Sequence, residues 1–212
     1  MIIFYKDKLD SSSTVEFIKG LTNDTGKDSY IRAKKINDYL TALQIYQKHL
    51  GEPYIVHLDS ELWELRPLKD RTIFGSWIEG GCVVLHSFNK TTKKTPSVEI
   101  EKARQNLKEF NKISIMTNQQ TWDNLRQECY IKQELATSDL RVAFIAELAK
   151  ARHILGYSQK KLEELSGVSQ PVIARIEKGG INPQLDTVLR MLAPLGKTLY
   201  VGDIEKNEAN EK

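Results

Sequence analysis

The sequence is poor in the residues that build metal and redox sites. Its two cysteines, Cys82 and Cys129, lie far apart and form no CxxC motif, which excludes a dithiol redox pair and a cysteine-rich zinc site. We expect both to be small apolar residues, buried or half-buried. The four histidines show no metal-ligand spacing. The sequence therefore predicts neither a bound metal nor any other cofactor.

Long apolar runs are also missing. No stretch approaches the roughly 18–20 apolar residues of a membrane span, and the opening Ile2–Tyr5 is too short for the core of a signal peptide. With 40% hydrophobic and 28% charged residues, the chain has the composition of a soluble globular protein. We expect it in the cytoplasm, with no membrane partner. Its 212 residues allow one large domain or two modest ones.

The excess of positive charge is confined to the first half of the chain. Residues 1–115 hold 18 Lys and Arg against 15 Asp and Glu, whereas residues 116–212 hold 13 of each kind. The net charge of +3 therefore belongs to the first half. An excess of this size is compatible with nucleic-acid binding but does not establish it.

The first half changes its hydrophobic period several times. Ile2–Tyr5 is a short strand candidate, 13–22 allows a short helix, and 29–50 carries apolar residues at spacings of three to five, as on one side of a long helix. Four further strands are expected at 54–58, 61–67, 71–78 and 82–88. Their short connections favour antiparallel pairing, and Pro96 can begin another helix. We predict an α+β domain: an antiparallel-rich sheet with helices on one face.

The second half is helical almost to its end. Helices are expected at 122–135 and 139–155, a cluster of short helices follows, and "KTLYVGDI" (197–204) is expected as one late strand. The polar tail is expected to be mobile. The predicted organisation is a first domain at 1–112, a junction at 113–120, an all-α second domain with a short C-terminal strand at 121–204, and the tail at 205–212.

The most specific motif runs from 157 to 196. Ser158 can cap one helix, Gly167 stands where a tight turn needs a residue without a Cβ, and Ser169 can cap a second helix. Two short helices joined by a turn of three or four residues form a helix-turn-helix. A plain helical bundle, or a degenerate motif used only for dimerisation, would show part of the same pattern.

In a helix-turn-helix the second helix enters the major groove of DNA with its N-terminus. Ser169, Gln170 and Arg175 would then face the DNA, because glutamine can pair with adenine and arginine with guanine or a phosphate. Gln159, at the start of the preceding helix, would lie against the DNA backbone. These four residues are the candidates for DNA binding.

Residues 145–196 resemble the Xre/Cro-type repressor family through this glycine, both serine caps and the two "SQ" pairs. The resemblance implies a repressor that binds operator DNA. Pro171 departs from the family pattern, because it stands where such proteins often carry a polar base-reading residue. Proline is tolerated in the first turn of a helix, but it removes one candidate base contact.

Cations gather near the expected strand ends of the first half. Arg66 and Arg71 flank one turn, and Lys90, Lys93 and Lys94 follow the last strand. If these strands are neighbours, the positive charge suits an RNA backbone, and also the extra negative charge of a phosphorane transition state. A lysine run is, however, more often a solvated face.

Cleavage of RNA asks little of a protein, because the 2′-hydroxyl of the substrate can be the nucleophile. The protein then supplies a proton acceptor, a proton donor and fixed positive charge. Arg66 and Arg71 can supply charge but stay protonated. His86 and Lys90 are the candidates for proton transfer, with His57 behind them, although a lone histidine on a strand is more often structural.

The motifs "LWELRP" (62–67) and "VVLHSFNKTTKKTP" (83–96) resemble the HigB branch of the RelE superfamily of toxins. The resemblance covers residues 1–112 and implies a RelE-like fold and a metal-independent, ribosome-dependent mRNA endonuclease that inhibits translation. It also implies that Arg66, Arg71 and Lys90 occupy the conserved basic positions of the family.

Two departures from that pattern stand in the same region. Some relatives place further lysines on the strand before Arg66, where this chain has Leu62 and Glu64. Some also carry a tyrosine near the position of Thr95. The resemblance therefore leaves the general acid and base unassigned.

A HigB-like toxin followed by an Xre-like antitoxin is the gene order of HigBA operons, and "MTNQQTWDNL" after Ile115 resembles the start of an antitoxin. Three accounts of Met116 stay open. In the first, the two modules are joined in one translated chain. In the second, two separate gene products are given as a single sequence. In the third, Met116 is an ordinary interior methionine.

On the toxin–antitoxin interpretation, the second domain binds the first through the helix 122–135, with Trp122 and Leu125 in the contact, and blocks its access to mRNA on the ribosome. The second domain also dimerises, binds operator DNA and represses its own operon. The alternative is a transcriptional regulator whose first domain is a non-catalytic sensor or partner-binding domain.

Overall fold

Five strands form one mixed sheet in the order β1-β5-β4-β3-β2. The strands are β1 (Ile2–Phe4), β2 (Ile55–His57), β3 (Leu62–Leu65), β4 (Asp70–Ile78) and β5 (Gly81–Asn89). The last four form the antiparallel meander that the short connections predicted. The N-terminal strand β1 joins β5 in parallel at the sheet edge, with Ile3 opposite Val83.

This computed structural model describes residues 1–47, 50, 54–78, 81–92, 94–112 and 120–202. The chain divides into two compact units, Met1–Phe144 and Ile145–Lys212. Most of the predicted junction (113–119) and the whole predicted tail (205–212) lie outside the described residues. No helix in the described part of the chain is long and apolar enough to span a membrane.

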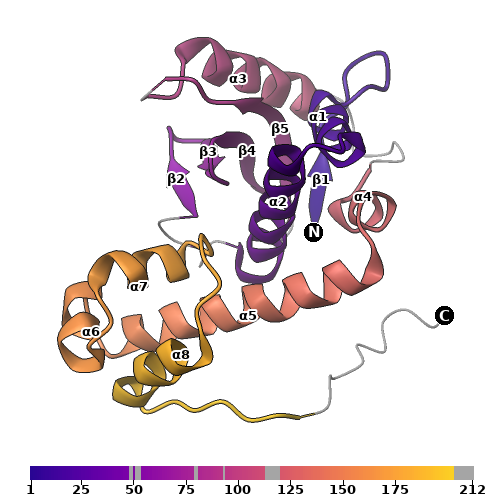
Figure 1. Cartoon of the computed structure of the whole chain (residues 1–212). Helices are drawn as coiled ribbons and strands as arrows, with labels where there is room; N and C mark the ends of the chain where they lie inside the picture. The colour runs from indigo at the N-terminus through magenta and orange to yellow at the C-terminus, as the bar shows by residue number, and fades with distance from the viewer. Residues whose placement is uncertain (48–49, 51–53, 79–80, 93, 113–119, 203–212) are drawn as a thin grey trace. The chain divides into compact units, whose positions relative to one another are not determined.

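Helices cover both faces of the sheet, so the prediction of helices on one face is wrong. Helices α1 (Ser13–Asn23) and α2 (Lys27–Tyr46) pack on the face that carries Leu65 and Phe74. Helix α3 (Ser97–Lys112) packs on the face that carries Leu62 and Ile73 (Figure 1). Because β3 and β4 carry buried apolar residues on both sides of their pleat, each face of the sheet needs a helix to exclude water.

Gly75 allows α3 to lie close to the sheet. A Cβ at this position would stand 2.8 Å from Cδ1 of Leu107, a residue of α3. Real Cβ atoms do not approach a neighbour that closely, so a larger residue at position 75 would require the Leu107 side chain to move. The absence of a side chain at Gly75 thus leaves room for Leu107 against the sheet.

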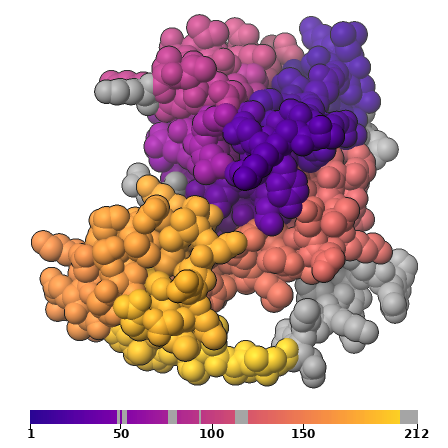
Figure 2. Space-filling model, viewed as in Figure 1, coloured from indigo at the N-terminus to yellow at the C-terminus, as the bar shows by residue number. Residues whose placement is uncertain are grey.

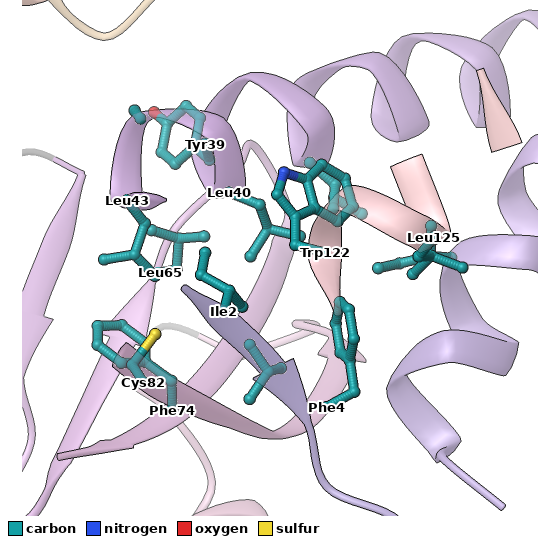
Figure 3. Packing of buried hydrophobic residues seen from close by; sticks show 14 of the residues in the cluster. Ile2, Phe4, Tyr39, Leu40, Leu43, Leu65, Phe74, Cys82, Trp122 and Leu125 are labelled. Carbon is teal, nitrogen blue, oxygen red and sulfur yellow. The ribbon is translucent and has the colours of Figure 1, made fainter. Parts of the chain in front are cut away.

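The first unit also contains α4 (Trp122–Cys129) and the first part of α5 (Lys132–Ile154). Trp122 is 1% exposed and Leu125 is fully buried, and both belong to the core that the sheet shares with α1 and α2. Trp122 packs edge-on against Phe4, with ring centroids 6.4 Å apart. Figure 3 shows Trp122 among Leu40, Ile2 and Phe4.

The boundary between the two compact units therefore lies after Phe144, and not at the predicted junction. The physical reason is the burial of apolar side chains, because α4 completes a core that begins with β1. Whether 113–120 joins two separate modules is a different question, and it stays a prediction.

The second unit is helical. It consists of the end of α5, α6 (Gln159–Ser166), α7 (Gln170–Glu177), α8 (Leu185–Leu192) and a 3-10 turn at Ala193–Leu195. The expected late strand is absent from 197–202, and 203–204 lie outside the described residues. A strand needs a hydrogen-bonding neighbour, and in the described part of this unit no strand is available to pair with it.

Candidate functional site

A buried carboxylate lies at the centre of the basic cluster. β3 places Glu64 on the α3 face of the sheet, where it is fully buried. Its Oε1 atom accepts a hydrogen bond from Nε of Arg66 at 2.6 Å and lies 3.6 Å from Nε of Arg71. Its other oxygen accepts a hydrogen bond from the Thr95 hydroxyl, just before α3. Glu64 therefore contacts both Arg66 and Arg71, the two arginines that flank the predicted turn.

The turn between Arg66 and Arg71 is itself fixed by a buried acid. Asp70 is fully buried and accepts hydrogen bonds from Arg32 of α2, at 3.0 Å from Nε and 2.7 Å from Nη2. Nη1 of Arg71 donates to the carbonyl oxygens of Leu68, at 2.9 Å, and Asp70, at 2.6 Å. The Arg71 side chain is thus clamped between the turn backbone and Glu64.

Lys90 completes the cluster at the end of β5. Its backbone N–H donates to the carbonyl of Lys69 at 2.8 Å, which ties it to the same turn. Burial lowers the pKa of the Lys90 ammonium, and the positive charge of Arg71 lowers it further. Burial also lowers the pKa of Arg71. Three cations around one carboxylate leave a net positive site.

Arg66 is the more accessible of the two arginines. Its side chain is 37% exposed, against 13% for Arg71. Among the described residues nothing accepts a hydrogen bond from its terminal nitrogens, since only Nε is used for Glu64. These nitrogens can therefore bind an incoming phosphate in a bidentate way.

His86 lies on the same face of the sheet as Glu64, with Ile73 of β4 between the two residues. Its side chain is 6% exposed, its Nε2 lies 2.6 Å from a carboxylate oxygen of Glu99 in α3, and its ring stacks on Phe88 at 5.6 Å. Burial lowers the pKa of His86, which favours the neutral ring. The ring is thus held between β5 and α3, and its catalytic role stays a prediction.

The remaining candidates for RNA contact are dispersed. His57 is exposed on β2 and packs against Trp63, with ring centroids 4.4 Å apart. Lys94 is exposed, and Lys93 lies outside the described residues. The expectation that all of these join one RNA-binding site thus stays a prediction.

Glu64 and Thr95 are the site residues that reasoning from the sequence missed. In the sequence alone, Glu64 stands out only as a departure from the HigB pattern. A signal for it is nevertheless present, because Glu64 and Arg66 are two residues apart within the predicted strand 61–67, in which alternate residues share a face. Thr95 gives no such signal, since it meets Glu64 from 31 positions away.

The second candidate site is the helix-turn-helix, and its local structure follows the predicted signals. The Ser158 hydroxyl accepts a hydrogen bond from the N–H of Lys161 and caps α6. Gly167 ends α6 with φ of 67°, the left-handed conformation that favours glycine. Ser169 stands at the N-cap of α7, but its side chain makes no capping hydrogen bond.

A buried ion pair holds the start of α6 against α7. Arg152, in the last turn of α5, contacts Glu177 through two hydrogen bonds of 2.6 and 2.9 Å. Glu177 accepts a further hydrogen bond from Nε2 of Gln159 at 2.8 Å, and Oε1 of Gln159 accepts one from Nε2 of Gln170 at 2.8 Å. The two glutamines predicted to contact DNA are therefore held together, while Arg175 is exposed.

Comparison with known proteins finds two families, one for each of the two sites described above. Residues 28–108 match the family described as phage derived protein Gp49-like, and residues 148–208 match the helix-turn-helix family. An uncharacterized HTH-type transcriptional regulator of Haemophilus influenzae is 55% identical over 92 residues, which are 43% of this chain and 92% of that protein. The chain belongs to the HTH-type transcriptional regulators.

A solved structure described as a toxin–antitoxin module from Streptococcus pneumoniae contains a chain of similar sequence. That chain is 54% identical, and the match covers 44% of this chain and 99% of the other with a TM-score of 0.37. The regulator thus extends well beyond each of these two relatives. The Gp49-like match falls on the unit that carries the Glu64 cluster, and the helix-turn-helix match falls on the unit that carries Gln159 and Gln170.

Proposed function

We propose that this chain is a toxin–antitoxin module. Its N-terminal domain is a metal-independent endoribonuclease that cleaves mRNA on the ribosome, as the resemblance to HigB of the RelE superfamily implies. Its C-terminal domain is a HigA-like antitoxin that neutralises the nuclease and represses its own operon. The observation that carries the proposal is that Arg66 and Arg71 share one buried carboxylate, Glu64, with the backbone of Lys90 bonded to the same turn.

The proposed cleavage uses the substrate's own 2′-hydroxyl. Its oxygen attacks the adjacent phosphorus, a proton leaves that hydroxyl, and the P–O5′ bond breaks, so the products are a 2′,3′-cyclic phosphate and a 5′-hydroxyl that has gained a proton. Arg66 and Arg71 stabilise the charge that accumulates on the phosphorane oxygens. Lys90 is the candidate for proton transfer, because its lowered pKa makes its neutral form more accessible.

In the DNA-binding domain, Gln170 and Arg175 read bases or hold phosphates in the major groove, and Gln159 and Ser169 contact the backbone at its edge. The exposed Leu185, Leu189 and Tyr200 support the dimerisation that a two-fold operator requires. Trp122 and Leu125 are the proposed toxin–antitoxin contact, supported by their burial against the sheet.

One observation favours the alternative, a transcriptional regulator with a non-catalytic first domain. His86 is engaged with Glu99, so the cluster has to rely on Lys90 for proton transfer. In that case the cations would bind an anionic partner without cleaving it.

Cell-free translation distinguishes the two. Residues 1–112 are produced without the rest of the chain, circular dichroism establishes that the fragment is folded, and mRNA ends are mapped on translating ribosomes. We expect new 5′ ends with the fragment, fewer with the full chain, and none with Arg66→Ala/Arg71→Ala. A folded fragment that leaves mRNA intact would overturn the nuclease proposal.

Intact mass under denaturing conditions decides among the accounts of Met116. One species near 24.3 kDa corresponds to a true fusion, with one antitoxin domain per toxin domain. Two species that divide at Met116 correspond to a two-protein complex whose ratio is free to vary.

A further inference from the structure

One side of α2 meets the sheet, and another is covered by α4 and the first part of α5. Ile36 and Leu40 point into the sheet core, with exposures of 1% and 0%. The covered side instead carries Asn37 and Asp38, which are only 2% and 6% exposed. Figure 2 shows the salmon-coloured α4–α5 segment directly against the indigo helix. This is an unusual way to bury a helix, since polar side chains are costly to remove from water.

Ser138 of α5 satisfies both of these polar residues. Its hydroxyl accepts a hydrogen bond from Nδ2 of Asn37 at 2.7 Å and donates one to Oδ1 of Asp38 at 2.6 Å. Ser138 is 1% exposed. All three side chains are therefore buried and hydrogen-bonded across about 100 residues of sequence, as buried polar groups require.

Two arginines flank this serine. Nε of Arg126, in α4, donates to Oδ1 of Asn37 at 2.8 Å, and Nη2 of Arg141, in α5, donates to Oδ1 of Asp38 at 2.8 Å. Arg126 also pairs with Asp139, which fixes its direction. We call Asn37, Asp38, Arg126, Ser138 and Arg141 the polar seam.

The apolar part of the same contact lacks this directionality. Trp122 and Leu125 fill space beside Phe4 and Leu40, and any apolar side chains of similar volume would satisfy much of that requirement. The polar seam is more demanding. A partner segment that cannot hydrogen-bond Asn37 and Asp38 would bury Asn37 unsatisfied and leave Asp38 only its ion pair with Lys35 of α2. Each lost hydrogen bond to a buried group costs about 1–3 kcal/mol.

The seam also suits a contact that opens. When α4 and α5 leave, the apolar residues around Trp122 and Leu125 become exposed, but Asn37 and Asp38 return to water at no such cost. Polar residues on a covered helix face thus favour a docking surface over a permanent core.

We infer that the polar seam determines which helical segment the first domain accepts as its inhibitor, and that opening the seam releases the domain. The fitting segment carries Ser and Arg one helical turn apart, as at 138 and 141, with a second arginine in the preceding helix. This inference rests on the proposed toxin–antitoxin function for its biological meaning. The selectivity of the polar seam for its partner segment is argued from the hydrogen bonds alone and does not depend on that function.

The test uses the full chain and charge reversal at one pair. Asp38→Arg places a cation against Arg141 and against Lys35, whose Nζ lies 3.7 Å from Oδ2 of Asp38. Asp38→Arg/Arg141→Asp restores the pair between positions 38 and 141 with the opposite polarity, while Lys35 still faces a cation. Glu147→Arg, a reversal at an exposed position of the same helix, is the matched control. Hydrogen–deuterium exchange of 122–144 reports opening, and cell-free translation reports release of the nuclease.

We expect Asp38→Arg to raise exchange in 122–144 by tenfold or more, with the double variant clearly below Asp38→Arg and Glu147→Arg unchanged from the parent chain. Unchanged exchange in Asp38→Arg, or no restoration in the double variant, would overturn the inference. If exchange in 122–144 rises but translation is unaffected, the role of the polar seam is supported and the nuclease proposal is contradicted. If Asp38→Arg also raises exchange in β4 and β5, the variant has disturbed the whole sheet, and Ser138→Ala is used instead. In Ser138→Ala we expect exchange in 122–144 to rise while β4 and β5 stay protected. No rise in Ser138→Ala would overturn the inference.

Discussion

Nε of Arg66 lies 2.6 Å from Oε1 of Glu64, a β3 residue two positions earlier in the chain. The same oxygen lies 3.6 Å from Nε of Arg71, so Glu64 offsets the repulsion between the two guanidinium groups before any substrate arrives. The terminal nitrogens of Arg66 stay available because only its Nε is used. Glu64 is therefore a positioning residue in the proposed nuclease.

Removal of this acid is expected to destabilise the first unit. Glu64→Ala leaves Arg71 and Arg66 without their shared counter-ion, and we expect a loss of about 2–3 kcal/mol, below the value for a fully buried pair because Arg66 is partly exposed. Urea denaturation followed by circular dichroism measures it. Glu61→Ala, at an exposed position beside β3, is the control and should change the free energy of unfolding by less than about 0.5 kcal/mol. Equal effects of both variants would contradict the central role of Glu64.

Lys90 is expected to act through its neutral form. Because burial and Arg71 lower its pKa, mRNA cleavage should rise with pH until that lowered pKa is passed. Lys90→Arg keeps the positive charge but cannot release a proton, so we expect at least about a 100-fold loss of cleavage and no rise with pH. The rate is measured on the folded 1–112 fragment. A Lys90→Arg variant with the parent's pH profile would remove Lys90 from proton transfer.

His86 is expected to matter for stability rather than for cleavage. His86→Ala deletes the ring and its hydrogen bond to Glu99, which should cost about 2–3 kcal/mol of unfolding free energy. Since the folded pKa of His86 is lowered, the unfolded chain takes up a proton first as pH falls below about 6.5. Stability is therefore lost between that pH and the lower folded pKa, and His86→Ala should abolish this part of the loss. Loss of cleavage in a stable His86→Ala variant would instead return His86 to the active site.

Operator binding is expected to depend on Gln159 and Gln170, which are hydrogen-bonded to each other. Gln170→Ala should weaken binding to the chain's own promoter by about 1–3 kcal/mol, and Arg175→Ala should also flatten the salt dependence if it holds a phosphate. Glu177→Ala should weaken binding without contacting DNA, because it removes the acceptor of Gln159. Fluorescence anisotropy measures all three, with Glu164→Ala on the exposed side of α6 as control. Unchanged affinity in Gln170→Ala/Arg175→Ala would rule out this mode of DNA binding.

Dimerisation is expected to use the exposed apolar residues of the second unit. Leu185 is 65% exposed and Tyr200 is 88% exposed, which is costly for a lone chain. Tyr200→Glu should raise the dimer dissociation constant by about tenfold or more, equivalent to about 1.4 kcal/mol. Sedimentation velocity measures it, with Lys160→Gln at an exposed position of α6 as a control that changes the charge by the same amount. A parent chain that is monomeric at micromolar concentration would contradict this prediction.

Local signals in the sequence determined the elements and several of their ends. Apolar spacing located α2, period-two runs located β2 to β5, and Ser158 and Gly167 marked the limits of α6. These features depend on residues close together in the chain, where backbone sterics and capping act directly. The gathering of Arg66, Arg71 and Lys90 followed from the same reasoning once neighbouring strands were assumed to pair.

Only the tertiary structure decided which long-range partners these elements found. It put α3 on the second face of the sheet, because both sides of β3 and β4 needed covering. It paired His86 with Glu99, which depends on how α3 lies over the strands, and it brought Arg71 of β4 to the carboxylate that also binds Arg66. It also buried Trp122 beside Phe4 and joined Ser138 to Asp38, residues about 100 positions apart that no local pattern relates.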